Sequence, residues 1–205
     1  MCIRDREYRF RTPIDERDVR KLRVGDIVFV DGVVVSCRDA GHRRCVEYLR
    51  RGEKLPVDLS GLVLYHMGPV VRKLGARWVI LSAGPTTSAR MEKYEAELIE
   101  KAGVRLIVGK GGMGARTAEA CREFGAAYAI FPGGAGALAA KLIERVERVE
   151  WLDLGVPEAM WVLRVRDFGP LMIAIDSAGR NFYEDHKKLL KENLRKAYSL
   201  IGYKA

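Results

Sequence analysis

The chain has 205 residues, of which 48% are hydrophobic, which is enough for one large domain with a core. No apolar run reaches the roughly 18 residues that a membrane-spanning helix needs, and the first residues lack the apolar stretch of a secretory signal. The net charge of +9 raises nucleic acid as a partner, but residues 1–54 carry 14 Lys and Arg against 10 Asp and Glu, so the charges are interleaved. Without a basic tail or an aromatic-basic motif, we expect a mixed solvated surface that contacts neither nucleic acid nor membrane.

Four cysteines are present, and none forms a C-x-x-C pair: Cys2, Cys37, Cys45 and Cys121. Their spacing matches no zinc or iron–sulfur pattern, so we predict reduced thiols of a cytoplasmic protein and no metal bound by this chain. Residues 1–6 fit nothing that follows them. We therefore assign a single domain to residues 7–205 and expect residues 1–6 to be non-native or disordered.

The first third of the chain predicts β structure. Residues 22–30 and 33–37 are two apolar runs separated by Asp31-Gly32, which is typical of a hairpin turn. A short helix is predicted over residues 39–51. Another short strand, residues 62–66, precedes Gly68-Pro69.

From Arg77 onward, strands and helices alternate. The predicted strands are residues 78–82, 105–109 and 127–131, and the helices that follow them are residues 91–103, 115–124 and 135–146. This order predicts a parallel sheet with right-handed crossovers. Two more strands, 161–168 and 171–176, flank Gly169-Pro170, and an amphipathic helix follows over 181–201. We place a boundary near Gly75, between two layers of one unit or two lobes in close contact.

Each of these β-α junctions carries a loop rich in glycine or hydroxyl groups: residues 83–90, 109–114 and 132–136. In a parallel sheet such loops share the edge at the carboxyl ends of the strands. Each loop also opens a helix, so free backbone N–H groups and the positive end of the helix dipole face that edge. One glycine-rich loop is usually only a tight turn, and none of the three is a Walker A or Rossmann motif. Three together, with Arg90 and Lys110, predict an anion site.

Five segments together resemble the β subunit of class I fumarases, which is also the C-terminal domain of fused iron–sulfur hydro-lyases. The segments are SCRDAGHRR (36–44), GPTTSARM (84–91), GKGGMG (109–114), PGGAGALAA (132–140) and residues 157–179. The resemblance covers residues 10–183 in order. It implies an α/β fold of the swivelling β/β/α type, with a β-rich N-terminal part followed by parallel-sheet βα units.

The resemblance also implies an activity and a partner. The nearest family members are β subunits of fumarate hydratase, which reversibly hydrates fumarate to malate, and of L(+)-tartrate dehydratase. In this family an α subunit binds the 4Fe-4S cluster, whose iron acts as a Lewis acid on the substrate, and the β subunit binds no cluster. The sequence does not choose between fumarate and tartrate, because these substrates differ by one hydroxyl and the discriminating contacts can lie in the partner.

Four site residues follow from the resemblance. It implies that Arg38, Arg90 and Lys110 contact the dicarboxylate, and that Thr86 transfers the proton. Arginine pairs with a carboxylate through two N–H groups and lysine acts as a point charge, so the residue types suit the substrate. A free hydroxyl is a very weak base, so Thr86 needs nearby cations to stabilise its alkoxide, or must act as a relay. Five further residues are expected to support these contacts: His42, Asp39, Thr87, Gly111 and Gly112.

Several of these positions also have plainer interpretations. We expect His66 to be a hydrogen-bonded core residue, His186 to lie on a helix surface, and Thr87 and Ser88 to cap the helix that starts at Ala89. Gly41 departs from the family pattern, in which a small residue such as alanine precedes His42. A non-catalytic module for a small anion is the alternative of another class. The hydroxyl of Thr86 favours an enzyme, because binding alone does not require it.

Overall fold

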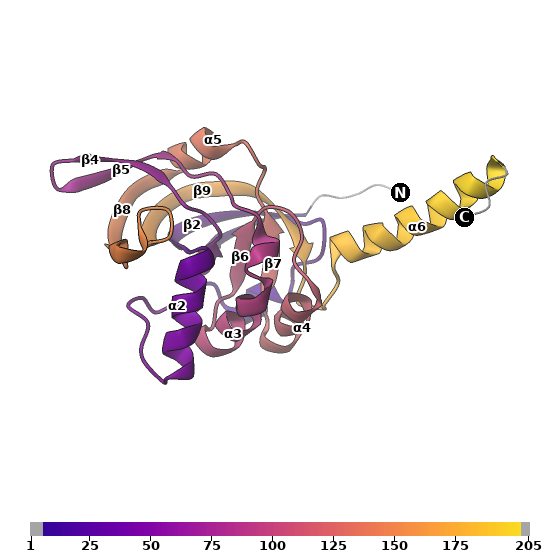
Figure 1. The fold of residues 1–205 in the computed structure, drawn as a ribbon, viewed down its shortest axis with the longest axis horizontal. Helices are drawn as coiled ribbons and strands as arrows, with labels where there is room; N and C mark the ends of the chain where they lie inside the picture. Colours follow the sequence, from indigo (N-terminus) through magenta and orange to yellow (C-terminus); the bar gives the residue numbers. More distant parts are fainter. Residues whose placement is uncertain (1–5, 202–205) are drawn as a thin grey trace.

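A computed structural model describes residues 6–201. Cys2 and the predicted non-native or disordered N-terminal segment, apart from Arg6, therefore lie outside the described residues. The fold is mixed α/β, with a seven-stranded sheet that closes on itself and helices against its outer face (Figure 1). The strands are β1 (Glu7–Arg11), β2 (Ile27–Ser36), β3 (Val63–Tyr65), β4 (Val70–Leu74), β5 (Arg77–Ser82), β6 (Leu106–Gly109), β7 (Ala127–Ile130), β8 (Ile143–Glu150) and β9 (Met160–Ile175). The helices are α1 (Glu16–Val19), α2 (Asp39–Arg50), α3 (Glu92–Ala102), α4 (Ala115–Phe124), α5 (Gly136–Lys141) and α6 (Phe182–Leu200), with 3-10 turns at Ser88–Arg90 and Leu152–Leu154.

Four parallel strands, β2, β3, β6 and β7, form the centre of the sheet in that order. The long strand β9 runs antiparallel to both β7 and β2, so it joins the two ends of this parallel set and closes the sheet. Strand β1 pairs with the first half of β2, and β8 pairs with β9. The prediction of parallel pairing is thus confirmed for β6 and β7.

The closed sheet has a core on each of its faces. Along β3, Val63 and Tyr65 belong to the cluster that fills the inside, whereas Leu64 between them packs outward. Outward-facing side chains of the parallel strands meet α2, α3 and α4, which lie side by side. The alternation has the period of two that a strand imposes. The carboxyl ends of the central strands are therefore fixed between two packed layers.

The predicted hairpin at Asp31-Gly32 is wrong. Residues 27–36 form one continuous strand, β2, whose pairing with β9 shifts register around these two residues. Gly32 has a φ of +106°, and a Cβ there would lie 2.4 Å from the Oγ1 of Thr12. The Asp-Gly pair therefore marks a bulge, where glycine is needed for the same conformational reason as in a turn.

The prediction that residues 78–82 form a strand of the parallel sheet is also wrong. Strand β5 pairs with β4 in a separate antiparallel hairpin that projects from the body (Figure 1). Trp78 and Ile80 pack on the core, but Val79 and Leu81 are 39% and 42% exposed. Gly75, predicted as a boundary, lies in the turn of this hairpin with a φ of +59°.

Two further elements differ from the prediction. The helix predicted over 135–146 ends at Lys141, and residues 143–150 form β8, which pairs antiparallel with β9. Ile143, Val146 and Val149 pack against the core at intervals of three residues, and the pairing shifts register after Ile143 and after Val146. The two strands predicted around Gly169-Pro170 are one bent strand, β9, which has the span needed to close the sheet. The helices predicted over 39–51, 91–103, 115–124 and 181–201 are confirmed to within one or two residues at their ends.

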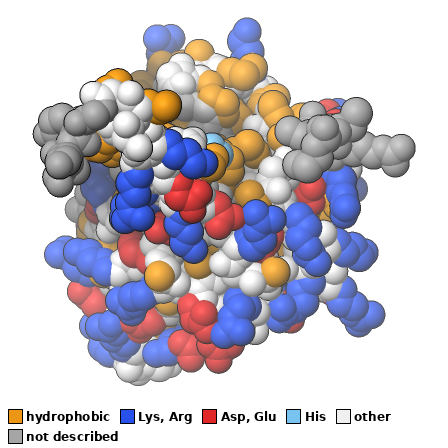
Figure 2. Space-filling view, turned by 90° about the vertical axis from the view of Figure 1, so that its right-hand side faces the viewer, with side chains coloured by type: hydrophobic (Ala, Val, Ile, Leu, Met, Phe, Trp, Pro, Cys, Tyr) orange, Lys and Arg blue, Asp and Glu red, His pale blue; other side chains and the backbone are white. Residues whose placement is uncertain are grey.

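Helix α6 extends away from the body and has no buried residue (Figure 1). No helix in the described part of the chain is both long and apolar enough to span a membrane. Figure 2 shows the face on the side of α6. Lys and Arg side chains project around its outline with Asp and Glu between them, and hydrophobic side chains gather in the upper part. On this face the charges are interleaved, as the sequence predicted.

Candidate active site

Three candidate residues follow three adjacent parallel strands. Arg38 comes two residues after β2, His66 directly after β3, and Lys110 directly after β6. Adjacent parallel strands end at the same edge of a sheet, so the topology brings these residues together although 72 positions separate the first from the last. Arg38 and Lys110 therefore lie at one edge of the sheet, as predicted, and their role there stays a prediction.

The loop that carries Thr86 reaches this edge by another route than predicted. It returns from the β4–β5 hairpin rather than from a strand of the parallel sheet. The backbone N–H of Thr86 donates to the carbonyl of His66 at 2.7 Å, and that of Ser88 donates to the carbonyl of Lys110 at 2.9 Å. Met67 bridges to Pro85 and Thr87 to Lys110, so the loop lies along the ends of β3 and β6.

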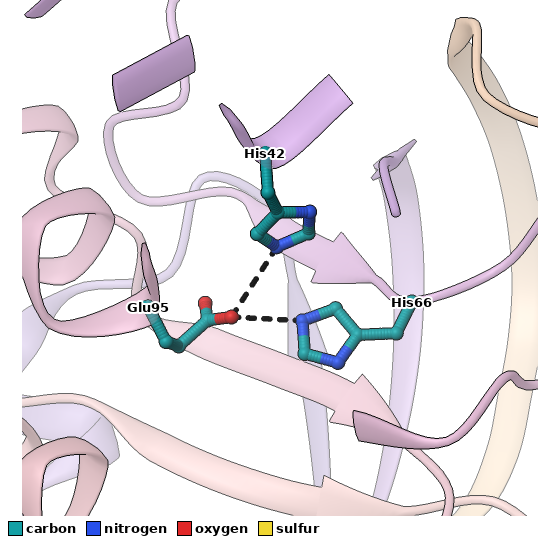
Figure 3. A group of neighbouring side chains, drawn as sticks. All are labelled: His42, His66 and Glu95. Carbon is teal, nitrogen blue, oxygen red and sulfur yellow. Dashed lines mark hydrogen bonds and ion pairs between the residues drawn. The ribbon is translucent and has the colours of Figure 1, made fainter. Parts of the chain in front are cut away.

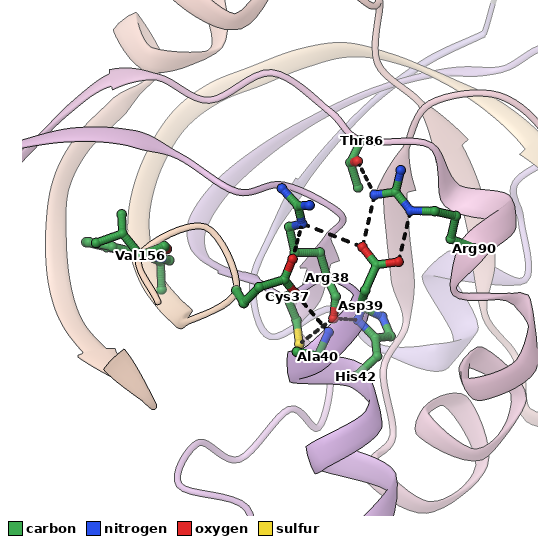
Figure 4. A network of polar contacts seen from close by, with 10 residues as sticks. Cys37, Arg38, Asp39, Ala40, His42, Thr86, Arg90 and Val156 are labelled. Carbon is green, nitrogen blue, oxygen red and sulfur yellow. Dashed lines mark hydrogen bonds and ion pairs between the residues drawn. The ribbon is translucent and has the colours of Figure 1, made fainter. Parts of the chain in front are cut away.

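A network of charged side chains joins this loop to the start of α2 (Figure 4). Arg90 donates to both carboxylate oxygens of Asp39 at 2.9 Å, and its Nη2 donates to the Oγ1 of Thr86 at 2.6 Å. Partial burial acts to raise the pKa of Asp39, but the guanidinium of Arg90 outweighs it and holds the pKa below its ordinary value. The hydroxyl of Thr86 thus lies against a cation that a carboxylate fixes in place.

Arg38 is held from two sides (Figure 4). Its Nε lies 2.8 Å from Oε1 of Glu158 and 3.6 Å from Oδ2 of Asp39. Its guanidinium lies against Gly68, where a Cβ would come within 2.8 Å of Nη1. Gly68 therefore allows the close approach of Arg38, while both terminal nitrogens of the guanidinium stay free of the ion pairs made by Nε.

Lys110 differs from Arg38 and Arg90, because those two cations form ion pairs with carboxylates. Its side chain is exposed, and its amino group forms no ion pair or hydrogen bond with any residue in the described range 6–201. The stem lies along the loop after β7, where a Cβ on Gly133 would lie 3.0 Å from Cδ of Lys110. An ammonium without an ion-pair partner, at the same sheet edge as Arg38, favours binding of an anion there.

The prediction of a free helix N-terminus is wrong for α4. The carboxylate of Glu92 accepts from the N–H of Gly114 at 2.6 Å and from the N–H and hydroxyl of Thr117, so it occupies the start of α4. Glu158 likewise accepts from the N–H of Ala40 at 2.8 Å, at the start of α2. Helix α5 has only six residues. Attraction for an anion therefore comes from the side-chain cations.

A buried polar cluster lies directly below this edge (Figure 3). Nε2 of His66 lies 2.9 Å and Nε2 of His42 3.3 Å from the same oxygen, Oε2 of Glu95, and none of the three side chains is exposed. Nδ1 of His66 lies 2.9 Å from Oγ of Ser88, and Nδ1 of His42 lies 3.0 Å from the carbonyl oxygen of Arg38. One ligand atom from each of His42, His66 and Glu95 falls within 4.8 Å of the others, so the group has the composition of a metal site.

The pKa values in this cluster have opposing causes. Burial acts to raise the pKa of Glu95, but the neighbouring histidines, His66 first, outweigh it and hold the pKa at about 2. Burial lowers the pKa of His66 despite the attraction of Glu95. Glu95 is therefore ionised and His66 neutral at physiological pH. The prediction of His66 as a hydrogen-bonded core residue is confirmed, and His186 is exposed on α6 as expected.

Glycines make the close approaches at this edge possible. A Cβ on Gly109 would lie 1.9 Å from Oγ of Ser88 and 3.1 Å from Nδ1 of His66. Gly111 has a φ of +78°, and its carbonyl accepts from the hydroxyl of Tyr128 at 2.7 Å. A Cβ on Gly112 would lie 3.0 Å from the ring of Tyr183. These contacts give Gly111 and Gly112 roles in shaping the loop that carries Lys110.

Gly41, the departure from the family pattern, also has a structural reason. A Cβ at this position would lie 2.5 Å from Sγ of Cys37 and 3.1 Å from the carbonyl oxygen of Glu158. Alanine would therefore require the Cys37 side chain to move. Glycine at position 41 leaves room for Sγ of Cys37, which precedes α2.

The described cysteines do not fit an iron–sulfur cluster. Cys37, Cys45 and Cys121 are free and buried. Burial raises the pKa of the Cys37 thiol well above its ordinary value and raises that of Cys121 as well. Cluster ligands are thiolates, and these side chains are packed in the core under α2 and α4. Their environment therefore favours inert thiols.

Sequence reasoning missed or misassigned four residues. Thr87 makes no capping hydrogen bond, and Ser88 bonds to His66 and to the N–H of Lys110 rather than to a helix end, so the predicted cap is wrong. Glu158 lay within a recognised segment but had no assigned role, and Glu95 had none either. The sequence could show only that Glu95 lies on the face of α3 that packs on the core. It could not show which residues of other elements contact this carboxylate.

A hollow in the described part of the chain lies away from these residues. It has a volume of about 690 Å³ and is lined by Leu49, Leu55 and Gly103, among others, at the far end of α2 from Arg38. The charged edge carries exposed side chains, among them Arg90 and Lys110. A ligand bound there needs a further wall to be enclosed.

Comparisons with known proteins agree with this geometry. Residues 4–186 match the model of the family described as Fumarase C-terminus. The chain is 49% identical to the L(+)-tartrate dehydratase subunit beta of Escherichia coli K12 over 181 residues, 88% of this chain and 89% of that protein. It is 44% identical to a putative L(+)-tartrate dehydratase subunit beta of Methanocaldococcus jannaschii over 96% of this chain and 99% of that one. A putative fumarate hydratase class I of Geobacillus stearothermophilus is 42% identical over 90% of this chain, which spans 35% of that longer protein.

Proposed function

The chain belongs to the Fumarase C-terminus family, and we propose that it is the β subunit of an iron–sulfur hydro-lyase that works with an α subunit. The reaction is the reversible hydration of fumarate to malate. Dehydration of L(+)-tartrate is the second candidate, and the names of the relatives at 49% and 44% identity favour it. The fold is the swivelling β/β/α type of that family, as a single domain over residues 7–205, in a cytoplasmic protein without nucleic-acid or membrane partners.

The contact between Arg90 and Thr86 carries this proposal. The guanidinium donates to Oγ1 of Thr86 at 2.6 Å, so this oxygen faces a cation at hydrogen-bond distance. A threonine hydroxyl can act as a base only where its alkoxide is stabilised, and Arg90 supplies that stabilisation. Asp39 fixes Arg90 from the other side. A module that only binds an anion has no need of this arrangement.

Arg38 and Lys110 bind the two carboxylates of the substrate. The terminal nitrogens of Arg38 lie free of its ion pairs, and the Lys110 ammonium has no partner among residues 6–201. A four-carbon dicarboxylate carries two negative charges, so each of these two cations can pair with one carboxylate. His42, Asp39, Thr87, Gly111 and Gly112 hold these loops in place.

The 4Fe-4S cluster of the complex is bound by the α subunit. Support comes from the buried thiols described above, whose environment does not suit cluster ligands. The exposed charged edge fits the same arrangement, because a partner that carries the cluster would also supply the missing wall.

The β4–β5 hairpin is the surface on which we place the α subunit. Val70, Leu74, Val79 and Leu81 are exposed on it, and its two ends continue into Gly68 and the Thr86 loop, which form the site. The face of a hairpin that stays in water is normally polar. Replacing Leu81 with Glu should weaken association with the α subunit, whereas the same change at Leu194 on α6 should not.

Reconstitution tests the function. The chain is mixed with the α subunit without oxygen, and turnover of fumarate and of L(+)-tartrate is measured separately. Turnover of either substrate that requires both chains supports the proposal, and the ratio of the two kcat/KM values decides between them. If the complex assembles with its cluster but turns over neither compound, the hydro-lyase assignment is wrong.

A further inference from the structure

The buried cluster connects two residues that the proposed function places at the substrate. Lys110 donates its backbone N–H to Oγ of Ser88 at 3.1 Å, and Ser88 lies 2.9 Å from Nδ1 of His66. His66 and His42 both direct Nε2 at Oε2 of Glu95, and Nδ1 of His42 reaches the carbonyl of Arg38. A continuous chain of polar contacts therefore runs from the backbone of Lys110 to that of Arg38.

The donors and acceptors along this series of polar contacts determine which ring nitrogens carry protons. His42 has an acceptor at each nitrogen, namely the Arg38 carbonyl at 3.0 Å and the Glu95 carboxylate at 3.3 Å. If His42 were neutral, one nitrogen would direct a lone pair at an acceptor inside the core, which is unfavourable. His66 has the opposite situation, because Ser88 can donate to its Nδ1 while its Nε2–H donates to Glu95. His66 is therefore satisfied as a neutral ring.

We propose that His42 is a buried imidazolium paired with the Glu95 carboxylate, and that Ser88, His66, Glu95 and His42 form a positioning relay that sets Lys110 relative to Arg38. None of the four side chains is exposed. They come from the loop after β5, from the end of β3, and from α3 and α2 respectively. The relay therefore ties together the separate elements that meet at the site, and its residues act through Arg38 and Lys110 rather than on the substrate.

Within residues 6–201, the ion pairs of His42 and Glu95 involve only these two residues and His66. His42 faces the ring of Tyr94, and Cys37 and Cys45 pack behind it in the same cluster. Asp39 is bound by Arg90, and Arg38 by Glu158. Neither Oε1 of Glu95 nor Nε2 of His42 forms a hydrogen bond of good geometry among the described residues. The hydrogen bond from His66 and the 3.3 Å ion-pair contact of His42 are therefore what offset the burial of this carboxylate.

A metal ion is the competing occupant of this cluster, since it would replace the proton between His42 and Glu95. The two interpretations predict different ring nitrogens. With a metal, both Nε2 atoms are ligands and carry no proton. With the relay, both Nε2 atoms are protonated, and only His42 has a proton on Nδ1 as well.

The test is 15N NMR of the full chain labelled at histidine, in the presence of a chelator. We expect His42 protonated on both nitrogens, His66 on Nε2 only, and exposed His186 to serve as the reference. In Glu95→Gln, His42 should lose its second proton, because an amide can donate to Nε2. A neutral His42 in the unaltered chain overturns the proposal. The proposal is also overturned if both Nε2 signals shift when Zn²⁺ is added and return when a chelator removes the ion.

A second variant covers the case in which Glu95→Gln does not fold. Ser88→Ala removes one link and leaves the His42–Glu95 pair intact, so amide exchange of Lys110 should rise by about tenfold or more while the His42 signals stay unchanged. Ser60→Ala, at an exposed serine outside these loops, is the matched control and should change neither. Unchanged exchange at Lys110 in Ser88→Ala contradicts the relay. These readouts need no turnover, so they succeed or fail independently of the proposed hydro-lyase function on which the role of Arg38 and Lys110 rests.

Discussion

Arg90 holds the hydroxyl oxygen of Thr86 at 2.6 Å with a nitrogen that also binds Asp39. The hydroxyl is thereby fixed as an acceptor, and its own proton is left free to point away from the guanidinium. Loss of that proton would place a negative oxygen next to a cation that is already oriented. Thr87, the next residue, is exposed and has no such partner among the described residues.

The first prediction compares these two threonines in the reconstituted complex. Thr86→Val keeps the volume and the branching but removes the hydroxyl, so kcat should fall roughly 100-fold or more, the usual effect of losing a general acid–base group. KM should change less. Thr87→Val is the matched control and should retain kcat. Equal kinetics of the two variants would assign the proton transfer to a group of the partner.

The second prediction concerns the two cations. Arg38→Ala and Lys110→Ala should each lower kcat/KM by an amount equivalent to about 2–5 kcal/mol, because each leaves a substrate carboxylate without its charged partner. Arg43→Ala, on the exposed side of α2, removes a charge of the same sign and should have little effect. Steady-state kinetics at fixed ionic strength measure all three. An effect of Arg43→Ala equal to the others would indicate a general field rather than contacts.

The sequence predicted which candidate residues share an edge better than it predicted how each of them reaches that edge. Arg38, Thr86, Arg90 and Lys110 do meet at one edge, and for Arg38 and Lys110 the reason is the one that parallel strands supply. Thr86 arrives there through a hairpin that looked like a buried strand, because Trp78 and Ile80 are as apolar as strand residues of the interior. Periodicity describes the side chains of a segment but not the strand with which it pairs.

The buried relay lay beyond prediction for a similar reason. Ser88, His66, Glu95 and His42 come from four elements, and no local pattern reports which side chains the topology will bring together. The closed sheet likewise depends on β9 pairing with both β2 and β7, two contacts that are remote in sequence. Glu92 occupies the start of α4, which local rules had left open to an anion.

The third prediction is that the isolated chain is folded, colourless and inactive. Cys37 and Cys121 should react slowly with a thiol reagent in the folded state, because both are buried and burial raises the pKa of each thiol. Both should react quickly in denaturant. An iron–sulfur absorbance band that stays with the purified chain, or turnover without the α subunit, would contradict the assignment of the cluster to the partner.

The fourth prediction is a pH dependence of stability. Burial lowers the pKa of His66 below its ordinary value of 6.5, and the cluster holds the pKa of Glu95 at about 2 rather than 4.5. For both groups the unfolded chain binds the proton more readily. The free energy of unfolding should therefore fall as the pH falls below 6.5, and further between 4.5 and about 2, by at most about 1.4 kcal/mol per pH unit for each group.

Urea unfolding at a series of pH values measures this dependence. His66→Gln should flatten the decline that begins below pH 6.5 relative to the unaltered chain, since its amide does not titrate. His186→Gln, at an exposed position on α6, should leave the curve unchanged. If both variants follow the same curve as the unaltered chain, the pKa of His66 is not lowered by burial in the folded protein.

The last prediction tests the packing beneath the site. Gly109→Ala places a Cβ 1.9 Å from Oγ of Ser88, so Ser88 must move or β6 must shift, and both are enclosed by the core. Overpacking of this kind costs about 1–3 kcal/mol in the free energy of unfolding. Gly84→Ala is the matched control, because its Cβ would meet its nearest neighbour at 3.4 Å and should cost little. Both are measured by denaturant unfolding.

A double variant shows whether the hydroxyl is the cause. Removing Oγ with Ser88→Ala should recover part of the loss in Gly109→Ala, although Cβ of Ser88 and Nδ1 of His66 would still lie only 3.2 and 3.1 Å away. The two changes should therefore be clearly non-additive. Simple addition of the two losses would mean that Gly109 and Ser88 do not share this space, and that the loop carrying Lys110 is held against the Thr86 loop in some other way.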